Sequence, residues 1–471
     1  MLVLFWLNEM HENTKRLLKA AENGNKNEIE RLLKEPDYND GGYGQAAMLE
    51  AAKKGQLEVM EMLHQTGIGL DCTNRNGSNA LHIAVYNDHI GTAQYLLTNG
   101  IQLEAKTRKG STPLHLAAYA GKTKMAKFLL DKGADLEAKT KRNSTPLHLA
   151  AFNGQMSTIA FLLDRGANME AKTRKGFTPL HLAVYNGNSE AAIFLVEKGA
   201  SLTTKTKKGS SALHLASFKG NLKLAEQLLA NGANLEAKGY KDTTPLHQAA
   251  YFGSTKTAEF LIEKGAKLEA RTVNGLTAFQ MAAFGGKSST VDLLLEKGAN
   301  SRVRTKKGLT ALQLAAFNGH TKTVGFLIGK GMQLEAKSKR GLTALHFAAL
   351  NGHNDTVEIL LQEGANIEAK TYKGSSPLKL ANFNGHKSTA ELLEHKLVRQ
   401  NWNSEKNQYF FNDTNGKGGD FAMKNFNDSK QWMEDKARQN ERPTDTSLFQ
   451  SARNTVQNAM NSMIFNFKRL F

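Results

Sequence analysis

Apolar residues recur at helical spacing in pairs of short segments, and these pairs repeat along most of the chain. In residues 112–133, Leu114 and Ala117 lie on one face of a first segment that Gly121 follows, and a second amphipathic segment runs to Gly133. Apolar positions three and four residues apart predict a helix in each segment. Glycine readily adopts the left-handed conformation in which many helices end. Each unit is therefore predicted to be two short helices joined by a tight turn.

The unit has a fixed length. A unit of two short amphipathic helices cannot bury its apolar faces alone, so neighbouring units are expected to stack and share one core. Two looser units come first, beginning near Leu17 and Met48. In the regular units that follow, the leucine of the "TPLH" motif or its equivalent recurs every 33 residues, at Leu81, Leu114, Leu147, Leu180, Leu213, Leu246, Phe279, Leu312, Leu345 and Leu378.

The start of each first helix carries capping residues. Thr112 is suited to cap its helix through the side-chain oxygen, and Pro113 suits the first helical position, where no amide donor is needed. Asp88 stands where other units have the glycine that ends the first helix, and aspartate tolerates the left-handed region better than most residues. Alanine, which is also acceptable in a first helical turn, replaces the proline at Ala80, Ala212, Ala278, Ala311 and Ala344.

The 33-residue period and the T-P-L-H-x-A pattern together resemble ankyrin repeats over roughly residues 12–398. The resemblance implies an all-α solenoid of about twelve helix–turn–helix units with β-hairpin-like fingers between them. A degenerate first unit suits a solubilising cap. The expected organisation is an array over residues 1–400 with degenerate units near 12–76 and regular units over 77–398, a polar linker over 401–445, and an amphipathic helix over 446–471.

A histidine follows the leucine in most units, and Gln280, Gln313 or Lys379 replaces it in others. Catalysis would need a nucleophile or carboxylate partner, whereas these histidines occupy the same helical turn of different units. The resemblance to ankyrin repeats implies a hydrogen-bonding structural role. The histidines are His82, His115, His148, His181, His214, His247 and His346.

Positive charge is concentrated in the fingers. Seven-residue windows such as "EAKTRKG" carry net charges from 0 to +4, and together they account for nearly all of the formal net charge of +18. Because packed helices lie roughly 10 Å apart, the finger cations are expected to form a row along one rim, with a weaker middle. The finger residues predicted to bind a partner are Arg108, Lys109, Lys141, Arg142, Arg174, Lys175, Lys207, Lys208, Tyr240, Lys306, Lys307, Lys339, Arg340, Tyr372 and Lys373.

Most of these fingers also carry a glutamate at the same position. These glutamates are expected to moderate the repulsion between the cations. Pairing with nearby lysines at exposed positions would contribute about 0–1 kcal/mol for each pair. The glutamates concerned are Glu104, Glu137, Glu170, Glu236, Glu269, Glu335 and Glu368.

An aromatic residue follows the "LHLAA" segment in most units, and the resemblance to ankyrin repeats implies that this position faces the concave groove. Asparagine comes next in several units, as at Asn153 and Asn186. Rings beside cations and amides favour a recognition surface. The alternative is that duplication copied one founder unit and that the rings pack on one another. The aromatics predicted to bind a partner are Tyr119, Phe152, Tyr185, Phe218, Tyr251, Phe284 and Phe317, while Tyr86 and Phe383 hold the same position.

Composition narrows the class of protein. Cys72 is the single cysteine, so no intramolecular disulfide can form and a reducing, cytoplasmic compartment is expected. The apolar start "MLVLFWLNEM" lacks the basic region and cleavage site of a signal peptide. No apolar run approaches the roughly 20 residues of a membrane helix. We expect no cofactor, no metal site and no catalytic residues, and the oligomeric state stays open.

The end of the chain departs from the repeat. Residues 401–445 are rich in asparagine, glycine and charge, which favours a loosely folded linker. Residues 446–471 carry a helical apolar stripe that includes Phe449, Val456 and Phe467. Three roles stay open for this stripe: an end cap on the array, a partner-binding or secretion address, and a membrane-surface contact.

Together, these observations predict that the chain is a binding scaffold without enzymatic activity. The basic fingers and the aromatic column favour an acidic protein partner. Binding to nucleic acid or to anionic phosphoinositide headgroups is an alternative, although the chain contains no known nucleic-acid module. An adaptor or an effector delivered by an intracellular bacterium into a host cytosol is a further alternative. The tail has neither histidine nor cysteine after residue 400, which argues against catalysis there.

Overall fold

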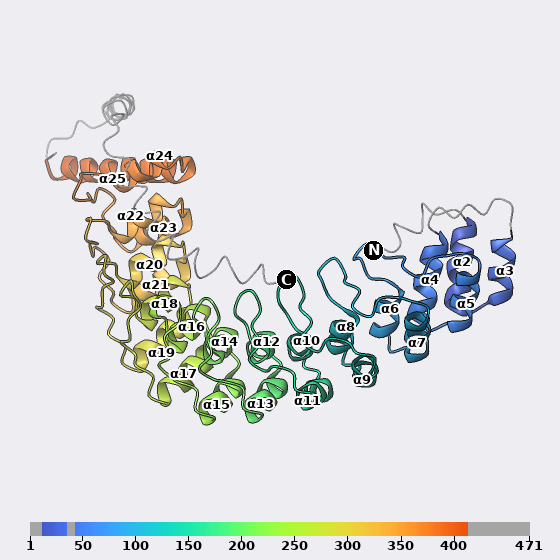
Figure 1. The fold of residues 1–471 in the computed structure, drawn as a ribbon. Coiled ribbons are helices and arrows are strands. Elements are labelled where there is room, and N and C mark those ends of the chain that lie inside the picture. Colours follow the sequence, from blue (N-terminus) through green and yellow to red (C-terminus); the bar gives the residue numbers. More distant parts are fainter. Residues whose placement is uncertain (1–11, 35–42, 413–471) are drawn as a thin grey trace.

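The computed structural model describes residues 12–34 and 43–412, which form an arch of stacked helix pairs (Figure 1). The first helices of the pairs are α2 (Glu12–Asn23), α4 (Tyr43–Lys54), α6 (Ala80–Tyr86), α8 (Pro113–Ala120), α10 (Pro146–Asn153), α12 (Pro179–Asn186), α14 (Ala212–Lys219), α16 (Pro245–Phe252), α18 (Ala278–Phe284), α20 (Ala311–Phe317), α22 (Ala344–Leu350) and α24 (Pro377–Phe383). The second helices are α3 (Lys26–Leu33), α5 (Leu57–Gln65), α7 (Ile90–Thr98), α9 (Thr123–Asp131), α11 (Met156–Asp164), α13 (Ser189–Glu197), α15 (Leu222–Ala230), α17 (Thr255–Glu263), α19 (Ser288–Glu296), α21 (Thr321–Gly329), α23 (Asn354–Gln362) and α25 (Lys387–Asn412).

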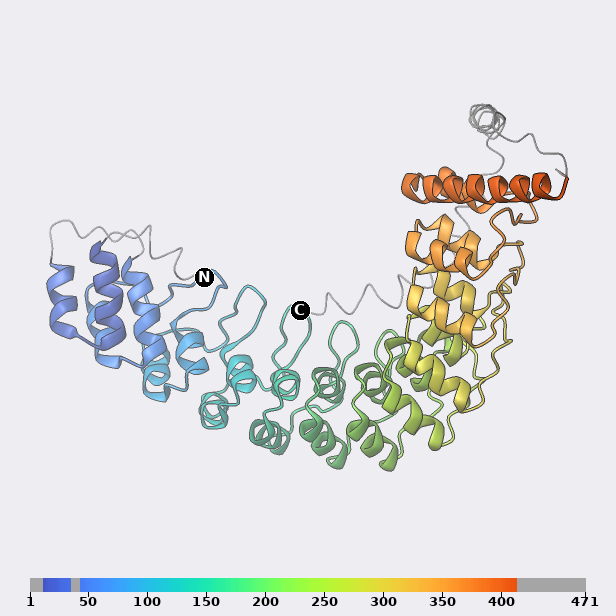
Figure 2. The same ribbon diagram turned by 180° about the vertical axis from the view of Figure 1, so that it is seen from behind.

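The arch has an inner side and an outer side. In its middle, from α8 to α15, the first helices lie toward the inside and the second helices toward the outside, and Figure 2 shows the same order from behind. The fingers project from the inner side as a series of loops. The finger that contains Thr73 and Asn79 has an isolated antiparallel bridge between these two residues. The predicted all-α solenoid is confirmed.

The predicted caps are present. Thr112 caps α8 and Pro113 occupies its first turn, while Gly121 ends the helix in the left-handed conformation with φ of 72°. The side-chain oxygen of Thr112 lies 2.8 Å from Nδ1 of His115, so the histidine completes the cap. Asp88 adopts a φ of 70°, as expected for a residue that replaces the terminal glycine. Local sequence therefore sets where each helix begins and ends.

The core runs between units as well as within them. Leu114 and Ala117 are fully buried in α8, and most regular repeats bury the same pair. Phe279 replaces the leucine in one repeat, and Leu378 is partly buried in the last. Two apolar clusters cover the length of the array, and Leu130 and Phe161 pack against both. Burial of a leucine side chain contributes about 1.5–3 kcal/mol, so loss of a neighbouring unit would expose a whole apolar face. Stacking is what makes these short helices stable.

The array extends further than the sequence analysis predicted. Helix α25 is 26 residues long and runs through residues 401–412, which were assigned to a polar linker. The reason is local, because the segment from Lys387 to Asn412 contains neither glycine nor proline to end the helix. The rest of that linker and the amphipathic helix predicted over 446–471 lie outside the described residues. None of the described helices is both long and apolar enough to cross a bilayer.

Candidate functional site

Each finger is closed by a tight turn that uses the threonine of the "TRKG" segment. The amide of Thr107 donates to the carbonyl oxygen of Ser111 at 3.0 Å, and the amide of Gly110 donates back to Thr107 at 2.8 Å. The Thr107 hydroxyl oxygen accepts a third bond from the amide of Ser111 at 3.1 Å. Gly110 has a φ of 79°, a conformation that side chains disfavour. The cations at 108 and 109 therefore lie at the tip of a rigid turn.

Backbone hydrogen bonds also join each fingertip to the next. The amide of Lys141 donates to the carbonyl oxygen of Lys109 at 3.0 Å, and the amide of Arg174 donates to Arg142 at 2.8 Å. We call this series the fingertip ladder. Its other bonds run from the amides of Arg108, Lys207, Val273, Lys306, Lys339 and Tyr372 to the carbonyl oxygens of Asn76, Lys175, Lys241, Asn274, Lys307 and Arg340, in that order.

The close approach of neighbouring tips explains the glycine at the end of the turn. A Cβ atom added to Gly110 would lie 2.8 Å from the backbone nitrogen of Lys141. Asn143 and Asp242 replace this glycine in two fingers and adopt φ of 58° and 60°. Asparagine is among the few residues with a side chain that accept the left-handed region.

The ladder is interrupted once among the described fingers. Gly239 replaces the threonine or serine that starts most of the other turns, so the finger has no hydroxyl at that point to accept the amide that Thr206 accepts from Ser210. Residues 240–242 form a 3₁₀ turn instead, with φ of 52° at Lys241. In the described structure the amide of Tyr240 makes no bond to the preceding fingertip. The weaker middle expected from charge is thus also a break in backbone pairing.

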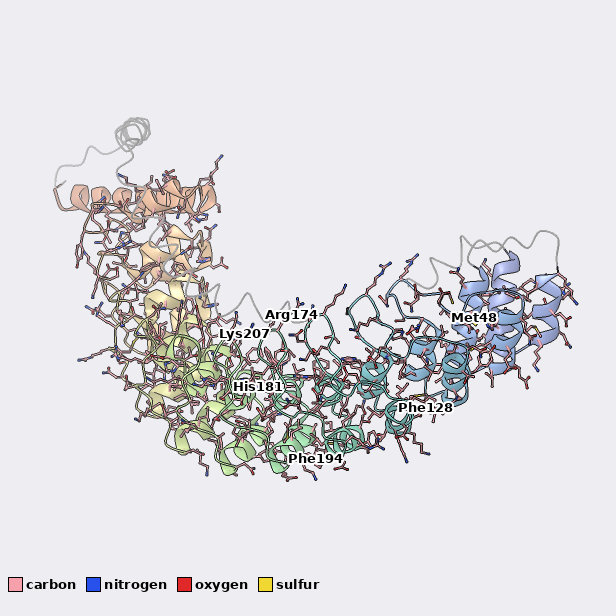
Figure 3. The ribbon with its side chains drawn as sticks, in the orientation of Figure 1. Met48, Phe128, Arg174, His181, Phe194 and Lys207 are labelled. Carbon is pink, nitrogen blue, oxygen red and sulfur yellow. The ribbon has the colours of Figure 1, made fainter. Side chains whose placement is uncertain are left out.

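The predicted finger cations lie at the surface. Arg174 and Lys207 are exposed, and Figure 3 shows both at the fingertips on the inner side of the arch. Partial burial lowers the pKa of Lys175, and the nearby positive charge of Arg142 lowers it further. The same two causes act on the pKa of Lys208, where Lys175 supplies the charge. Residues at the second cation position of successive tips therefore act on one another electrostatically.

A second cationic stretch follows the break. Partial burial lowers the pKa of Lys307, and the positive charge of Arg340 on the next tip adds to the effect. Lys306 and Lys339 are exposed at the neighbouring first position. Tyr240 and Tyr372 stand at that first position in their own fingers, with exposed fractions of 41% and 69%.

The finger glutamates do not pair with the finger lysines, contrary to expectation. Oε1 of Glu137 accepts the amide of Asn168 in the next unit at 2.7 Å, and Oε1 of Glu104 accepts that of Asp135 at 3.0 Å. Across the described residues, the ion pairs of the regular repeats lie almost entirely on the helices; Lys238 and Asp242, 4.0 Å apart, form the pair found in a finger. The same backbone contact is made by Glu170, Glu236, Glu269 and Glu335.

The recurrent histidines are structural. Nε2 of His115 lies 2.9 Å from the carbonyl oxygen of Ser144 in the next finger, while Nδ1 faces the helix cap. Burial lowers the pKa of His115 to about 4, so the ring is neutral at neutral pH. Gln280 reproduces both contacts, with Oε1 3.2 Å from the amide of Thr277 and Nε2 3.1 Å from the carbonyl oxygen of Leu309. These structural contacts account for the residue at this position without a catalytic role.

The aromatic column is at least partly exposed toward both ends of the array and is buried in the units between them. Tyr119, Phe152, Tyr185 and Phe218 are half-buried, whereas the exposed fractions of Tyr251, Phe284 and Phe317 are 8%, 4% and 3%. The prediction that the last three rings line an open groove is wrong. The serines that precede the first helix in many units are replaced there by Leu276, Leu309 and Leu342, which belong to the same buried cluster as the rings.

Two of the half-buried rings, Tyr185 and Phe218, form a cluster with Phe252 on α12, α14 and α16. Tyr185 and Phe218 stack with their centroids 6.3 Å apart and their planes at 8°. Lys219 places Nζ 4.5 Å from the Tyr185 centroid, within the range of a cation–π contact. Phe252 meets Phe218 edge to face at 4.3 Å. Burial raises the pKa of the Tyr185 hydroxyl.

The asparagines beside the aromatics have a structural use that the sequence did not reveal. Nδ2 of Asn153 donates to the carbonyl oxygen of Tyr119 at 2.9 Å, and Nδ2 of Asn186 donates to Phe152 at 2.8 Å. These amides link the ends of neighbouring first helices. Their donor groups are therefore engaged within the array rather than offered to a partner.

A second aromatic series lies on the outer helices and was missed. Lys132 lies over Phe128 with Nζ 5.7 Å from the ring centroid, and the guanidinium of Arg165 lies 4.8 Å from the centroid of Phe161. The signal was an aromatic followed four residues later by a cation, a spacing that places both on one helix face. Phe128 and Phe194 mark this outer side in Figure 3, opposite Arg174 and Lys207.

Comparison with known proteins gives a consistent result. A family model described as "Ankyrin repeats (3 copies)" matches residues 48–140, 136–206, 200–272, 267–338 and 329–405. The Notch-regulated ankyrin repeat-containing protein of Xenopus laevis is 33% identical over 93 residues, which are 18% of this chain and 82% of that protein. Its human counterpart is 32% identical over 92 residues, covering 18% and 81%.

Two further matches cover less. An L-asparaginase of Dirofilaria immitis is 44% identical over 48 residues, and the match covers 10% of this chain and 8% of that protein. Among solved structures, the human ASB11 ankyrin repeat domain is 28% identical with a TM-score of 0.43, and the match covers 47% of this chain and 98% of that one.

Proposed function

The chain belongs to the ankyrin-repeat family, and we propose that it is a non-enzymatic scaffold whose fingertips bind an acidic protein segment. Ankyrin repeats are in general protein–protein interaction modules and typically have no enzymatic activity. The asparaginase match spans only 8% of that enzyme and gives no reason to assign its reaction. With a single, buried cysteine whose pKa burial raises to about 11, the scaffold suits the reducing cytosol.

The observation that carries the proposal is a row of cations at the surface whose fingertips are held at a fixed spacing. The ladder bond between Lys141 and Lys109 repeats along the tips, so each cation pair is positioned by backbone rather than by flexible side chains. The nearest acids, such as Glu137, direct an oxygen to the backbone of the next unit. A field of one sign along a rigid rim attracts a segment of the opposite charge.

The aromatic cluster on α12, α14 and α16 supplies a second part of the interface. Tyr185 and Phe218 are half-buried and stacked, so a partner gains apolar contact there without ordering a flexible side chain. Aromatic residues of this kind dominate the binding energy of many interfaces. The proposed contact residues are Arg108, Lys109, Lys141, Arg142, Arg174, Lys175, Lys207, Lys208, Tyr240, Lys306, Lys307, Lys339, Arg340, Tyr372, Lys373, Tyr119, Phe152, Tyr185 and Phe218.

The test is charge reversal at four tip positions in the full chain, with Lys207, Lys208, Lys306 and Lys307 all replaced by glutamate. In the matched control, glutamate replaces four exposed lysines of the outer helices, Lys124, Lys127, Lys223 and Lys256. Both variants change the net charge equally. Capture of acidic proteins from cell lysate at ~150 mM salt should fall for the tip variant alone. Equal capture by wild type and tip variant, at unchanged helical content, would reject the electrostatic mechanism.

A further inference from the structure

The fingertip ladder fixes the distance from one cation pair to the next. Each finger contributes two strand-like segments, paired with each other by the bond from Thr107 to Ser111 and with the next finger by the bond from Lys141 to Lys109. Paired strands lie about 4.8 Å apart, so one repeat advances by about 10 Å at the tips. Because these bonds lie at the tips themselves, the curvature of the arch does not alter the step.

The cations form two tracts along this step. The first tract comprises the tips of fingers 107–110, 140–143, 173–176 and 206–209, and the second comprises fingers 305–308 and 338–341. The two fingers between them, with Tyr240 and Val273 at the first cation position, have no cation pair at the tip. A segment bound to the first tract therefore meets four cation pairs in succession, and one bound to the second meets two.

Few backbone conformations repeat a side chain on one face every 10 Å. In a β-strand, alternate residues on one face are about 6.7 Å apart and the next are about 13 Å apart, so neither matches. A polyproline II helix has three residues per turn and rises about 3.1 Å per residue, which repeats one face every ~9.3 Å. An α-helix repeats approximately one face every seven residues, or ~10.5 Å. Spacing alone leaves the polyproline II helix and the α-helix.

The finger tyrosines favour the polyproline II helix. Tyr240 stands at the first cation position of the finger after the first tract, and Tyr372 stands at that position in the finger after the second. Both rings are exposed at 41% and 69%. Lys241 lies 5.2 Å from the Tyr240 centroid and Lys337 lies 5.9 Å from the Tyr372 centroid. Aromatic rings at the surface are the usual docking point of proline-rich polyproline II segments.

We propose that each tract binds a segment in polyproline II conformation with an acidic residue at every third position, so that successive carboxylates meet successive fingertips. This inference rests on the proposed function and specifies the partner's charge pattern. The backbone supports this inference, because the bonds from Arg174 to Arg142 and from Lys207 to Lys175 hold three successive tips in register.

The experiment measures the binding of four labelled probes to the full chain by fluorescence anisotropy at ~50 mM salt, where screening is weak. The first two probes are peptides of equal composition. One peptide has four glutamates at every third position on a proline- and serine-rich background, and a second has them at every second position. A third, longer peptide has glutamates at every seventh position of a helical background, and a single-stranded oligonucleotide serves as the fourth probe. The period-three peptide should bind about threefold to fivefold more tightly than the period-two peptide. In the period-two peptide, about two of the four glutamates would not lie opposite a fingertip cation, so about two exposed ion pairs are lost.

A pair of variants locates the effect. Lys175→Glu with Lys208→Glu should abolish the preference for period three, whereas Lys127→Glu with Lys223→Glu on the outer helices should preserve it. Equal affinity for periods two and three overturns this inference and leaves the proposed function standing. Tighter binding of the helical peptide overturns the polyproline II assignment. If no peptide binds, or if the oligonucleotide binds most tightly, the proposed acidic protein partner fails as well.

Discussion

Nε2 of His115 lies 2.9 Å from the carbonyl oxygen of Ser144, which is 29 residues further along the chain in the next finger. Its Nδ1 accepts the amide of Thr112 at 3.2 Å within its own unit. One buried ring thus joins a helix cap to the finger that follows it. The position of each finger relative to the helices depends on this bridge, and so does the line of cations at the tips.

Replacing His115 by leucine is expected to destabilise the array by about 2 kcal/mol or more, because an amide and a carbonyl group would be left buried without partners. Replacing it by glutamine is expected to cost much less, since Gln313 already donates to the carbonyl oxygen of Leu342 at 2.8 Å in its own unit. Urea unfolding followed by circular dichroism measures both. A leucine variant as stable as the glutamine variant would contradict the bridging role.

Stability is expected to fall as the pH is lowered from about 7 to about 5. Burial lowers the pKa of His148 and His214 to about 4, below the ordinary value of about 6.5. Between these values the unfolded chain binds more protons than the folded chain, so the free energy of unfolding rises with pH across this window. Protonation of Nδ1 would also remove the acceptor for the cap amide.

The measurement is the urea midpoint at several pH values for the wild type and for a variant with glutamine at positions 115, 148 and 214. The wild-type midpoint should decrease steadily below pH 6.5, and the variant should show a shallower decrease. An unchanged slope in the variant would show that other groups control the pH dependence.

The sequence predicted the fold because the features that define it are local. Thr112, Pro113 and Gly121 mark the two ends of one helix within ten positions, and the 33-residue step repeats those marks. The histidine role also followed, through resemblance. The extension of α25 past residue 400 did not follow, because the analysis placed the boundary where the repeat ends rather than where a helix-breaking residue occurs.

The candidate site was predicted only in part, since its details depend on contacts between units. Glu137 was expected to meet a lysine close in sequence, but Oε1 accepts an amide 31 residues away. The burial of Phe317 has the same origin, because it belongs to one apolar cluster with residues from neighbouring units. The replacement of serine by Leu309 was visible in the sequence, but its effect on a ring eight positions later was not.

The break in the fingertip ladder is expected to be detectable by hydrogen exchange. The amide of Tyr240 should exchange at least about tenfold faster than that of Lys207, because only the latter donates to a neighbouring fingertip. Val273 is the control, as its amide donates to the carbonyl oxygen of Lys241 at 2.9 Å on the far side of the break. Equal protection of all three amides would show that the row of tips is continuous in solution.

Substitutions along the aromatic column should separate stability from binding. Phe317→Ala removes a ring with 3% exposure and is expected to destabilise the array by about 3–5 kcal/mol, as for other buried phenylalanines. Tyr119→Ala removes a half-buried ring and should cost clearly less. If the inner side of the arch binds an acidic segment, Tyr119→Ala should weaken that binding at nearly unchanged stability. The same four units then carry both the first cationic tract and the accessible rings, so loss of binding without loss of stability would tie both to one surface. A Tyr119→Ala variant that loses stability as severely as Phe317→Ala would instead assign the whole column to the core.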